Sequence, residues 1–515
     1  MPTSNSWEPV TGSFPGYYRT AAALLADGAR VLLTGGSHDP AHGGGCRQAW
    51  RYDGAQIVQL AEAMIQPRFG HTATTLGNGK VLLAGSEALD ATAGRAAGTA
   101  ELYDPALGQF AATGNLAEPR GWHTATWLPS CGKVLIAGGE DPALRLNGIV
   151  SPKTSAELYD PATGVFRKTS HPLNAARSGH TATLLQDNTV LIVGGYSTAA
   201  RGSAEIYNPA TETFTPIAGP SIGRFDHAAT LLHDGRVLIA GGYENGGGTT
   251  GHEEIFNPIS KLFTEVAPIQ KTAYGLTLTT LANGKVLAVG GSADGERIPD
   301  LTIDPYWWIF DPTPAIPTFT KMPVTTQRIA FHTATLLASG CVFVAGGAGI
   351  GNQFPGNGML YWPDLVTLRL NFQGGGAGSV TGHPARIACT GNAVFQVPAG
   401  IQLFLFAQAA APWMSTGWEM APGAPGPIGA YRPQRWTKVM VLHTNVFDGW
   451  GKLAPFDAAN PLVLVMNTNR SPVVNFGAHT STAPWPGPRI LPAIQRSPSG
   501  ITPPALPAHE RGSRP

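Results

Sequence analysis

The chain has 515 residues, with 34 Lys and Arg against 33 Asp and Glu, which gives a formal net charge of +1. A charge near zero produces no long-range field, which argues against nucleic acid or an anionic membrane as the main partner. Charged residues make up only 13% of the chain, whereas 65 Gly and 44 Pro indicate many turns between short strands. The sequence contains no apolar run of the ~18 residues that a transmembrane helix needs.

The N-terminal segment MPTSNSWEPV has neither the basic region nor the apolar stretch of a secretory signal. Low charge favours an extracellular or cell-surface location. The four cysteines have neither CxxC nor metal-ligand spacing, so we expect free thiols, which favour a reducing compartment such as the cytoplasm. Both locations stay open, as do the redox states of Cys46, Cys131, Cys341 and Cys389.

A repeated unit organises residues 1–363, and its clearest copy spans residues 178–214. Two apolar, β-branched runs at 181–185 and 190–193 predict a hairpin. A third strand is expected at 204–207, and a fourth opens at Phe214 after an Asn-Pro turn. The unit therefore reads as one small antiparallel sheet of four strands.

Seven copies of this unit can be aligned. Their spacing of roughly 50 residues is that of a propeller blade. A glycine corner ends the second strand of each copy, at Gly35-Gly36, Gly85-Ser86, Gly138-Gly139, Gly194-Gly195, Gly241-Gly242, Gly290-Gly291 and Gly346-Gly347. One sheet of this size cannot cover both its faces, so the copies must stack against one another.

An aromatic residue precedes the next turn in every copy, at Tyr52, Tyr103, Tyr159, Tyr207, Phe256, Phe310 and Tyr361. Together with the corner glycines and the closing aromatics Phe110, Phe166, Phe214 and Phe263, this pattern resembles the kelch repeat. The resemblance implies an all-β fold, a seven-bladed β-propeller of bacterial kelch type, distantly like the propeller of galactose oxidase.

Closure of the ring can also be predicted. The seventh copy stops after Tyr361 and lacks a fourth strand, whereas the segment from Trp7 to Val10 precedes the first complete hairpin and aligns with fourth strands. We expect this segment to pair with the last blade, which removes an open sheet edge.

Three polar residues recur in the regular blades: Arg68, His71 and Glu101; Arg120, His123 and Glu157; Arg177, His180 and Glu205; Arg224, His227 and Glu254. A ring of histidines invites a metal hypothesis. Blade one, with Arg19 aligned to the His and Trp50 to the Glu, and blade six, with Leu276 and Trp308, lack both partners. We therefore expect one bonded structural set per blade, and assign no metal and no cofactor.

The loop after each glycine corner varies in length and chemistry. Variable loops on a rigid ring are where recognition usually resides. The larger side chains in these loops are our candidates for holding a partner: Arg145, Arg201, Tyr243, Glu244, Arg297, Tyr306 and Phe354.

Propellers of this type include the galactose oxidase and glyoxal oxidase group, which are copper enzymes with a tyrosyl radical. That chemistry requires a Tyr-His ligand pair, and none of the 12 tyrosines is followed by His. We assign no catalytic residue; His42, His252 and Glu296 are the few acid–base candidates outside the repeated positions.

Residues 364–477 change character. An alternating strand at 366–372, a glycine-rich turn, a strand at 403–407, Gly417-Trp418 and a closing segment at 462–476 resemble the divergent internalin B-type repeat of bacterial surface proteins. The resemblance implies a small β domain that acts as a spacer or adhesive module. The Pro-rich tail, residues 478–515, is expected to be disordered.

The function favoured by these observations is a non-catalytic binding or adhesion scaffold that presents a loop-rich propeller face to a protein or glycan partner. The alternatives are a carbohydrate-active or oxidase-like enzyme with a site at the channel mouth, and a structural subunit of an extracellular assembly. The partner and the oligomeric state stay open.

Overall fold

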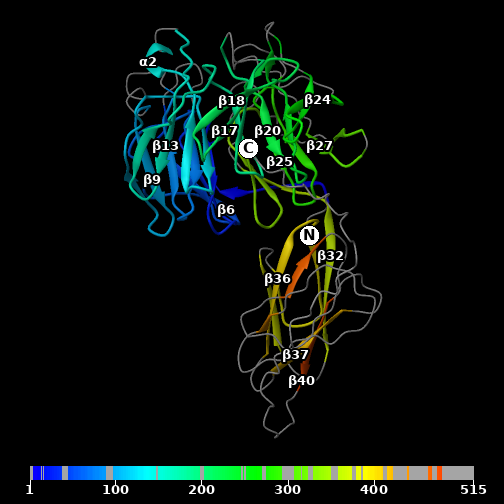
Figure 1. Ribbon diagram of the computed structural model, residues 1–515. Coiled ribbons are helices and arrows are strands. Elements are labelled where there is room, and N and C mark those ends of the chain that lie inside the picture. Colours follow the sequence, from blue (N-terminus) through cyan, green and yellow to red (C-terminus); the bar gives the residue numbers. More distant parts are fainter. Residues whose placement is uncertain are drawn as a thin grey trace, which may run out of the picture.

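The computed structural model (Figure 1) describes residues 4–12, 14–15, 17–37, 45–87, 97–145, 149–197, 202–244, 248, 251–269, 274–292, 307–314, 316–322, 329–348, 358–373, 378–383, 387–409, 414–420, 438–439, 462–466 and 472–477. The fold is all-β, and within these residues the one α-helix is α2 (Pro142–Arg145). None of the described helical structure is long and apolar enough to cross a membrane. The four cysteines are free, as expected.

Seven antiparallel sheets form a propeller, which confirms the predicted blade number. From the axis outward, blades 1 to 3 consist of β3 (Ala21–Leu24), β4 (Val31–Thr34), β5 (Ala49–Tyr52) and β6 (Gln56–Gln59); β7 (Thr72–Thr75), β8 (Val81–Ala84), β9 (Ala100–Asp104) and β10 (Gln109–Ala112); β11 (Thr124–Leu128), β12 (Lys133–Ala137), β13 (Ala156–Asp160) and β14 (Val165–Lys168). A short strand, β2 (Thr11–Gly12), joins the outer edge of blade 1 in parallel.

Blades 4 to 6 repeat the arrangement with β15 (Thr181–Leu184), β16 (Val190–Val193), β17 (Ala204–Asn208) and β18 (Thr213–Ile217); β20 (Ala228–Leu231), β21 (Val237–Ala240), β23 (Glu253–Asn257) and β24 (Leu262–Val266); β25 (Thr277–Thr280), β26 (Val286–Val289), β27 (Trp308–Asp311) and β28 (Thr318–Lys321). A two-stranded ribbon of β19 (Arg224–Phe225) and β22 (Tyr243–Glu244) stands beside blade 5.

Blade 7 consists of β29 (Thr333–Leu336), β30 (Val342–Ala345), β31 (Met359–Trp362) and β1 (Ser6–Pro9). The N-terminal strand pairs antiparallel with β31, with Trp7 opposite Tyr361. The ring of Trp7 lies 4.8 Å from that of Tyr361, and Val10 N donates to Gly358 O. The predicted closure of the propeller by the N-terminus is therefore confirmed.

The second strand of each blade explains how the ring holds together. In β16 all four residues are buried, and the same is true of β8 and β21. Both faces of such a strand are covered by adjacent blades, so it can be apolar throughout. Along the axis, each first strand packs against the first strand of the next blade, and β29 packs against β3.

The chain after Trp362 forms two further sheets. One contains β32 (Leu365–Gln373), β35 (Ala393–Pro398), β37 (Met414–Met420) and β40 (Pro472–Gly477); the other contains β33 (Gly378–His383), β34 (Ile387–Cys389), β36 (Gln402–Ala409), β38 (Lys438–Val439) and β39 (Leu462–Val465). Leu368, Leu370, Val380, Leu403 and Leu405 belong to their core. The domain boundary at 363/364 and the internalin-type assignment stay predictions, and the tail 478–515 lies outside the described residues.

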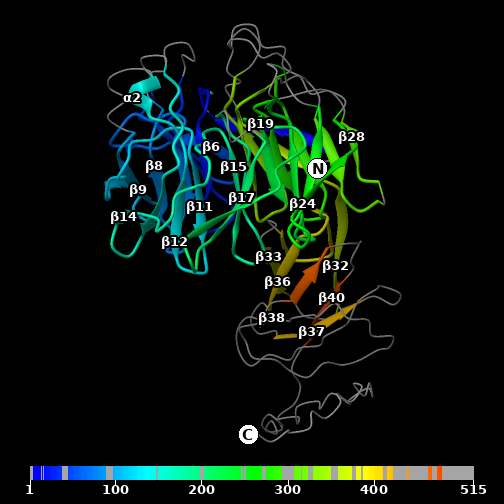
Figure 2. The same ribbon diagram turned by 45° about the horizontal axis from the view of Figure 1, so that its top comes forward.

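These sheets attach to the end of the propeller where the first two strands of blades 6 and 7 are joined. A Cβ on Gly340 would lie 2.4 Å from Ile401, and one on Gly400 would lie 2.1 Å from Ala282 O. Lys285 Nζ contacts Asp364 at 3.0 Å. The opposite end, where each first strand begins and each second strand ends, holds the site described next (Figures 1 and 2).

Candidate functional site at the channel mouth

Each blade enters its first strand through a residue in the left-handed conformation. The seven equivalent residues, with φ between 51° and 66°, are Arg19, Gly70, Trp122, Gly179, Asp226, Gly275 and Phe331. Left-handed backbone costs an L-residue roughly 1–2 kcal/mol, and glycine avoids this cost. Three blades use glycine, whereas four carry a side chain under strain.

Backbone hydrogen bonds connect these positions from blade to blade. Gly70 N donates to Arg19 O, Gly179 N to Trp122 O, Asp226 N to Gly179 O, Gly275 N to Asp226 O and Phe331 N to Gly275 O, at 2.8 to 3.5 Å. These bonds cover five of the seven blade junctions, and all seven residues line one axial cavity. We call this ring of seven residues the mouth belt.

Glycines of the mouth belt make room for its large side chains. A Cβ on Gly179 would lie 2.7 Å from Asp226 Oδ1, and one on Gly275 would lie 2.9 Å from Phe331 Cδ1. Large and small residues therefore alternate from Arg19 to Phe331, and these two large residues are neighbours where the ring closes. Because glycine fits the same backbone in neighbouring blades, the four strained side chains point to a role of the side chains themselves.

Arg19 lies across the opening. Its guanidinium carbon is 3.3 Å from the centre of the Trp122 ring, 4.9 Å from that of Phe331 and 5.0 Å from that of Tyr18. Its Nη2 is 3.9 Å from Asp226 Oδ2. One cation is thus held by aromatic rings and a carboxylate, which is a cation–π arrangement with a counter-ion.

The position of Arg19 corrects the sequence alignment. The corner glycines of blades 1, 3 and 6 face the Cε1 of the next histidine, whereas the corner glycine of blade 7, Gly346, faces Thr20. Thr20 therefore occupies the histidine position of blade 1, and Arg19 precedes it. The alignment failed because blade 1 lacks both the Arg and the His that mark blades 2 to 5.

Behind the mouth belt lies an axial cavity of about 300 Å³, lined by belt residues and by five histidines: His71, His123, His180, His227 and His332. Each histidine has its Nε2 2.8 to 3.0 Å from a threonine hydroxyl of the preceding blade: Thr34, Thr72, Thr124, Thr181 and Thr277. Burial lowers the pKa of His123, His227 and His332 to about 3. These three imidazoles are therefore neutral near pH 7.

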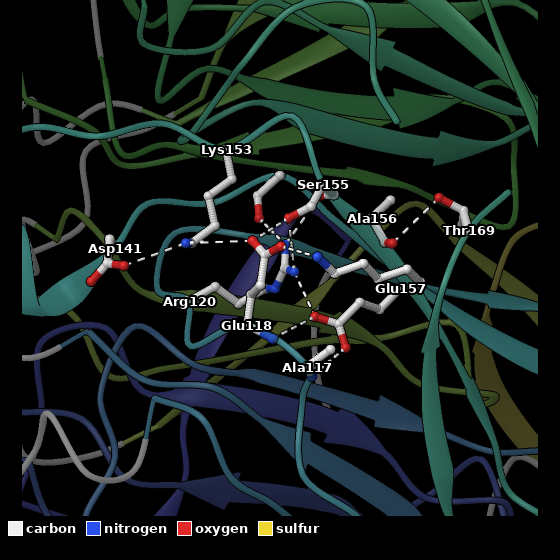
Figure 3. Close-up of polar contacts among 11 residues, drawn as sticks. Ala117, Glu118, Arg120, Asp141, Lys153, Ser155, Ala156, Glu157 and Thr169 are labelled. Carbon is white, nitrogen blue, oxygen red and sulfur yellow. Dashed lines mark hydrogen bonds and ion pairs between the residues drawn. The ribbon is translucent and has the colours of Figure 1, made fainter. Parts of the chain in front are cut away.

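The arginines and glutamates form a separate set. In blade 3 (Figure 3), Arg120 Nη2 donates to Glu157 Oε1 at 2.6 Å and Arg120 Nη1 to Gly138 O at 2.6 Å. Glu157 in turn accepts from the main-chain N of Ala117 and Glu118. The same buried ion pair occurs as Arg68–Glu101, Arg177–Glu205 and Arg224–Glu254. The expected set of three thus divides into an Arg–Glu pair and a His–Thr pair, each bonded within or between blades.

A second cavity of about 220 Å³ adjoins the belt between blades 3, 4 and 5. It is lined by Trp122, Glu140, Val150, Ser178, Gly179, Tyr196, Phe225 and Asp226. An arc of aromatic contacts continues from it around the mouth, with ring centres 4.3 to 5.3 Å apart: Tyr196–Phe225, Phe225–Tyr243, Tyr243–Tyr274 and Tyr274–Phe331.

Two of the predicted loop residues are described with their surroundings. Tyr243 belongs to the aromatic arc, and Glu244 pairs with Arg224 in the β19–β22 ribbon. The main chain of Arg145 ends α2, but its side chain lies outside the described residues, as do Arg201, Arg297, Tyr306 and Phe354. Of the acid–base candidates, His252 contacts Glu265 at the surface, and His42 and Glu296 lie outside the described residues.

Trp122, Asp226 and Phe331 were not predicted from the sequence. They directly precede a repeated histidine, and their chemistry varies from blade to blade while the histidine does not. The contrast between a variable residue and the constant histidine after it was the sequence signal that could have identified these residues. Their role as a site depends on the left-handed backbone, which brings the three side chains together at the axis.

The fold and the site define a seven-bladed β-propeller with an aromatic, charged channel mouth. A scan of protein-family models finds no match, and no curated protein sequence matches the chain. Among solved structures, a fungal alcohol oxidase of the AA5 family, in complex with copper, is similar at 17% identity and a TM-score of 0.56, over 79% of this chain and 97% of that one. A protein named YjhT is similar at 12% identity and a TM-score of 0.46, over 60% of this chain and 99% of that one.

The copper of the fungal oxidase prompts a test of the donor atoms here. Among the described residues, no group of three or more His, Cys, Asp or Glu side chains is placed to hold a metal. The described residues therefore do not fit a copper centre, and the likeness at this identity shows the fold alone.

Proposed function

We propose that this protein is a non-catalytic binding scaffold whose channel mouth and surrounding loops hold a protein or glycan partner. The main support is the mouth belt, in which Arg19, Trp122, Asp226 and Phe331 keep side chains in a backbone conformation that glycine adopts in the other three blades. Strain of this kind is typical of functional sites. Two adjoining cavities and an aromatic arc supply contact area for a partner.

The attachment of the C-terminal sheets supports the same proposal. They contact the hairpin ends of blades 6 and 7, at the far end of the strands from the mouth. We propose that they act as a spacer, as the internalin-type resemblance implies, and that the kelch-type propeller works at a bacterial cell surface. A cytoplasmic location is the alternative.

The test is a glycan and protein binding screen with variants that replace strained side chains by glycine. Glycine already adopts this left-handed backbone at the equivalent positions of three other blades, Gly70, Gly179 and Gly275. The variants Trp122→Gly and Asp226→Gly should therefore fold, and they should lose binding. Lys261→Gly is the matched control, because Lys261 is also left-handed, with φ 58°, but lies in the exposed turn between β23 and β24. Equal binding by all variants would refute the mouth as the binding site.

An oxidase-like or carbohydrate-active enzyme with a site at the same mouth is the second candidate, and the shared fold of the alcohol oxidase favours it. Metal analysis of the purified full-length chain separates the two. Stoichiometric copper, together with alcohol or sugar oxidation that Trp122→Gly abolishes, would replace the scaffold by the enzyme.

A further inference from the structure

The mouth already contains one bound cation, supplied by the chain itself. The guanidinium of Arg19 lies on the Trp122 ring and faces Asp226, with Phe331 and Tyr18 at its sides. This arrangement shows directly which chemical group aromatic rings and a carboxylate hold at this position. Cation–π contacts of this kind are stronger where water is excluded.

The cavity of about 220 Å³ shares two of these residues, Trp122 and Asp226, and adds a second set of the same chemistry. Tyr196 and Phe225 form two walls whose rings are 5.1 Å apart and nearly perpendicular, at 81°. Glu140, only 3% exposed, supplies a second carboxylate. Among the residues that the structure describes, no Lys, Arg or His lines this cavity.

The fold explains why these groups converge. Glu140 and Tyr196 are the residues directly after the glycine corners of blades 3 and 4, and each is bridged to the strand entry of its own blade, at Gly121 and Ser178. Phe225 precedes Asp226 in the entry of blade 5. Three consecutive blades therefore each direct corner or entry residues toward one cavity.

The charges decide between ligand classes. Two carboxylates and the rings of Trp122, Tyr196 and Phe225 line the cavity, and Arg19 forms an ion pair with Asp226 at its edge. Carboxylates and aromatic faces both favour a positive charge in a largely buried site. A cationic ligand would gain both interactions, whereas a neutral ligand would gain neither.

We propose that this cavity binds an organic cation, an alkylammonium or guanidinium group, which enters beside Trp122. The aromatic rings and carboxylates of the cavity would hold this cation as Trp122 and Asp226 hold the guanidinium of Arg19. The cavity has the volume of roughly seven waters, which accommodates the end of a Lys or Arg side chain or a small amine. The inference rests on the proposed function and specifies the chemistry of the partner.

The experiment is calorimetric titration of the full-length protein with four probes. Two are cations, butylammonium chloride and Nα-acetyl-lysine methylamide, which keeps its ε-ammonium group. Two are neutral, Nα-acetyl-norleucine methylamide and methyl glucoside. The two cations should bind, with affinity that falls as salt is added, and the two neutral compounds should not. Tighter binding of the lysine derivative than of butylammonium would indicate a protein side chain as the source, and equal binding a free amine.

Glu140→Gln removes one charge at nearly constant volume and should weaken cation binding by about tenfold, equivalent to roughly 1.4 kcal/mol. Phe225→Leu is the second variant, in case the buried amide of the first variant impairs folding, and should weaken binding similarly. Glu265→Gln, on the exposed strand β24, is the control and should leave the affinity unchanged.

Equal binding of the norleucine and lysine derivatives, or an unaltered affinity of both cavity variants, would overturn the cation site. Binding of methyl glucoside alone, lost in Trp122→Gly, would also overturn it while the mouth survives as a binding site. If none of the four probes binds, the inference is refuted. The glycan and protein screen would then decide the proposed function separately.

Discussion

His227 Nε2 lies 2.8 Å from Thr181 Oγ1, and the next pair of blades has lost both partners together: Ala228 takes the threonine position and Leu276 the histidine position. The two apolar residues pack in one cluster at the junction of blades 5 and 6. At this junction an apolar contact thus replaces the His–Thr bond between neighbouring first strands.

The replacement of His and Thr by Leu and Ala at the next junction predicts an energetic coupling between His227 and Thr181. His227→Leu alone leaves the Thr181 hydroxyl without its partner and should lower the free energy of unfolding by about 1–3 kcal/mol. The double variant His227→Leu, Thr181→Ala copies the blade 5–6 junction and should recover most of the loss. Urea unfolding of the four proteins of this double-mutant cycle gives the coupling energy, and additive effects would contradict it.

The histidines also predict acid sensitivity. Burial lowers the pKa of His123, His227 and His332 to about 3 in the folded protein, against a usual 6.5. Between these values the unfolded chain binds protons that the folded chain does not. Stability is therefore complete above pH 6.5 and falls with acidification, by about 1.4 kcal/mol per pH unit for each histidine.

The measurement is the free energy of unfolding between pH 7 and pH 4. The double variant at Thr181 and His227 should show a slope smaller by one proton than the wild type. An unchanged slope would mean that His227 titrates normally in the folded state.

For Glu253 we predict the opposite dependence of stability on pH. It is buried in β23 and accepts a hydrogen bond from Ile269 N at 2.9 Å, and burial raises its pKa to about 7 from the usual 4.5. The folded protein therefore holds a proton that the unfolded chain releases between pH 4.5 and 7. Its contribution to stability is largest below pH 4.5 and falls by about 3 kcal/mol as the pH rises to 7.

Glu253→Gln keeps an acceptor for Ile269 N and cannot ionise. The difference in unfolding free energy between this variant and the wild type should grow in favour of the variant from pH 5 to pH 8. Glu265→Gln, at an exposed carboxylate of the same hairpin, should show no such trend.

Breaking the buried Arg120–Glu157 ion pair should cause a large loss of stability. Both side chains are inaccessible to solvent, and Arg120→Met leaves Glu157 as an uncompensated buried charge. The expected cost is about 3–5 kcal/mol. Arg167→Met removes the partner of Glu212 in an ion pair whose arginine is 49% exposed, and should cost less than about 1 kcal/mol. Similar midpoints in urea would contradict the structural role of the buried pair.

Deletion of residues 1–15 should open the propeller. It removes β1, whose Trp7 packs against Tyr361 and Trp307, and it exposes the edge of β31. An exposed edge favours association. Size-exclusion chromatography should show oligomers, and a synthetic peptide of residues 4–12 added in trans should restore the elution of the intact chain. An unchanged elution after deletion would refute closure by this strand.

Much of the architecture could be predicted from local pattern. The repeat fixes where strands such as β16 and β17 begin and end, because apolar runs, the Gly194-Gly195 corner and the Asn208-Pro209 turn are each coded by adjacent residues. The Arg177–Glu205 pair recurs with the repeat and could be anticipated in the same way, although its separation from His180 could not.

By itself, the sequence determined the number of blades and their closure, because a four-stranded unit must bury both faces against copies of itself and the last copy lacks a strand that the N-terminus carries. Only the tertiary structure decided the site. Arg19, Trp122, Asp226 and Phe331 are far apart in the chain, and no local pattern connects them. They meet because each enters its blade in the same left-handed conformation around a common axis, a relationship that exists only once the ring has formed.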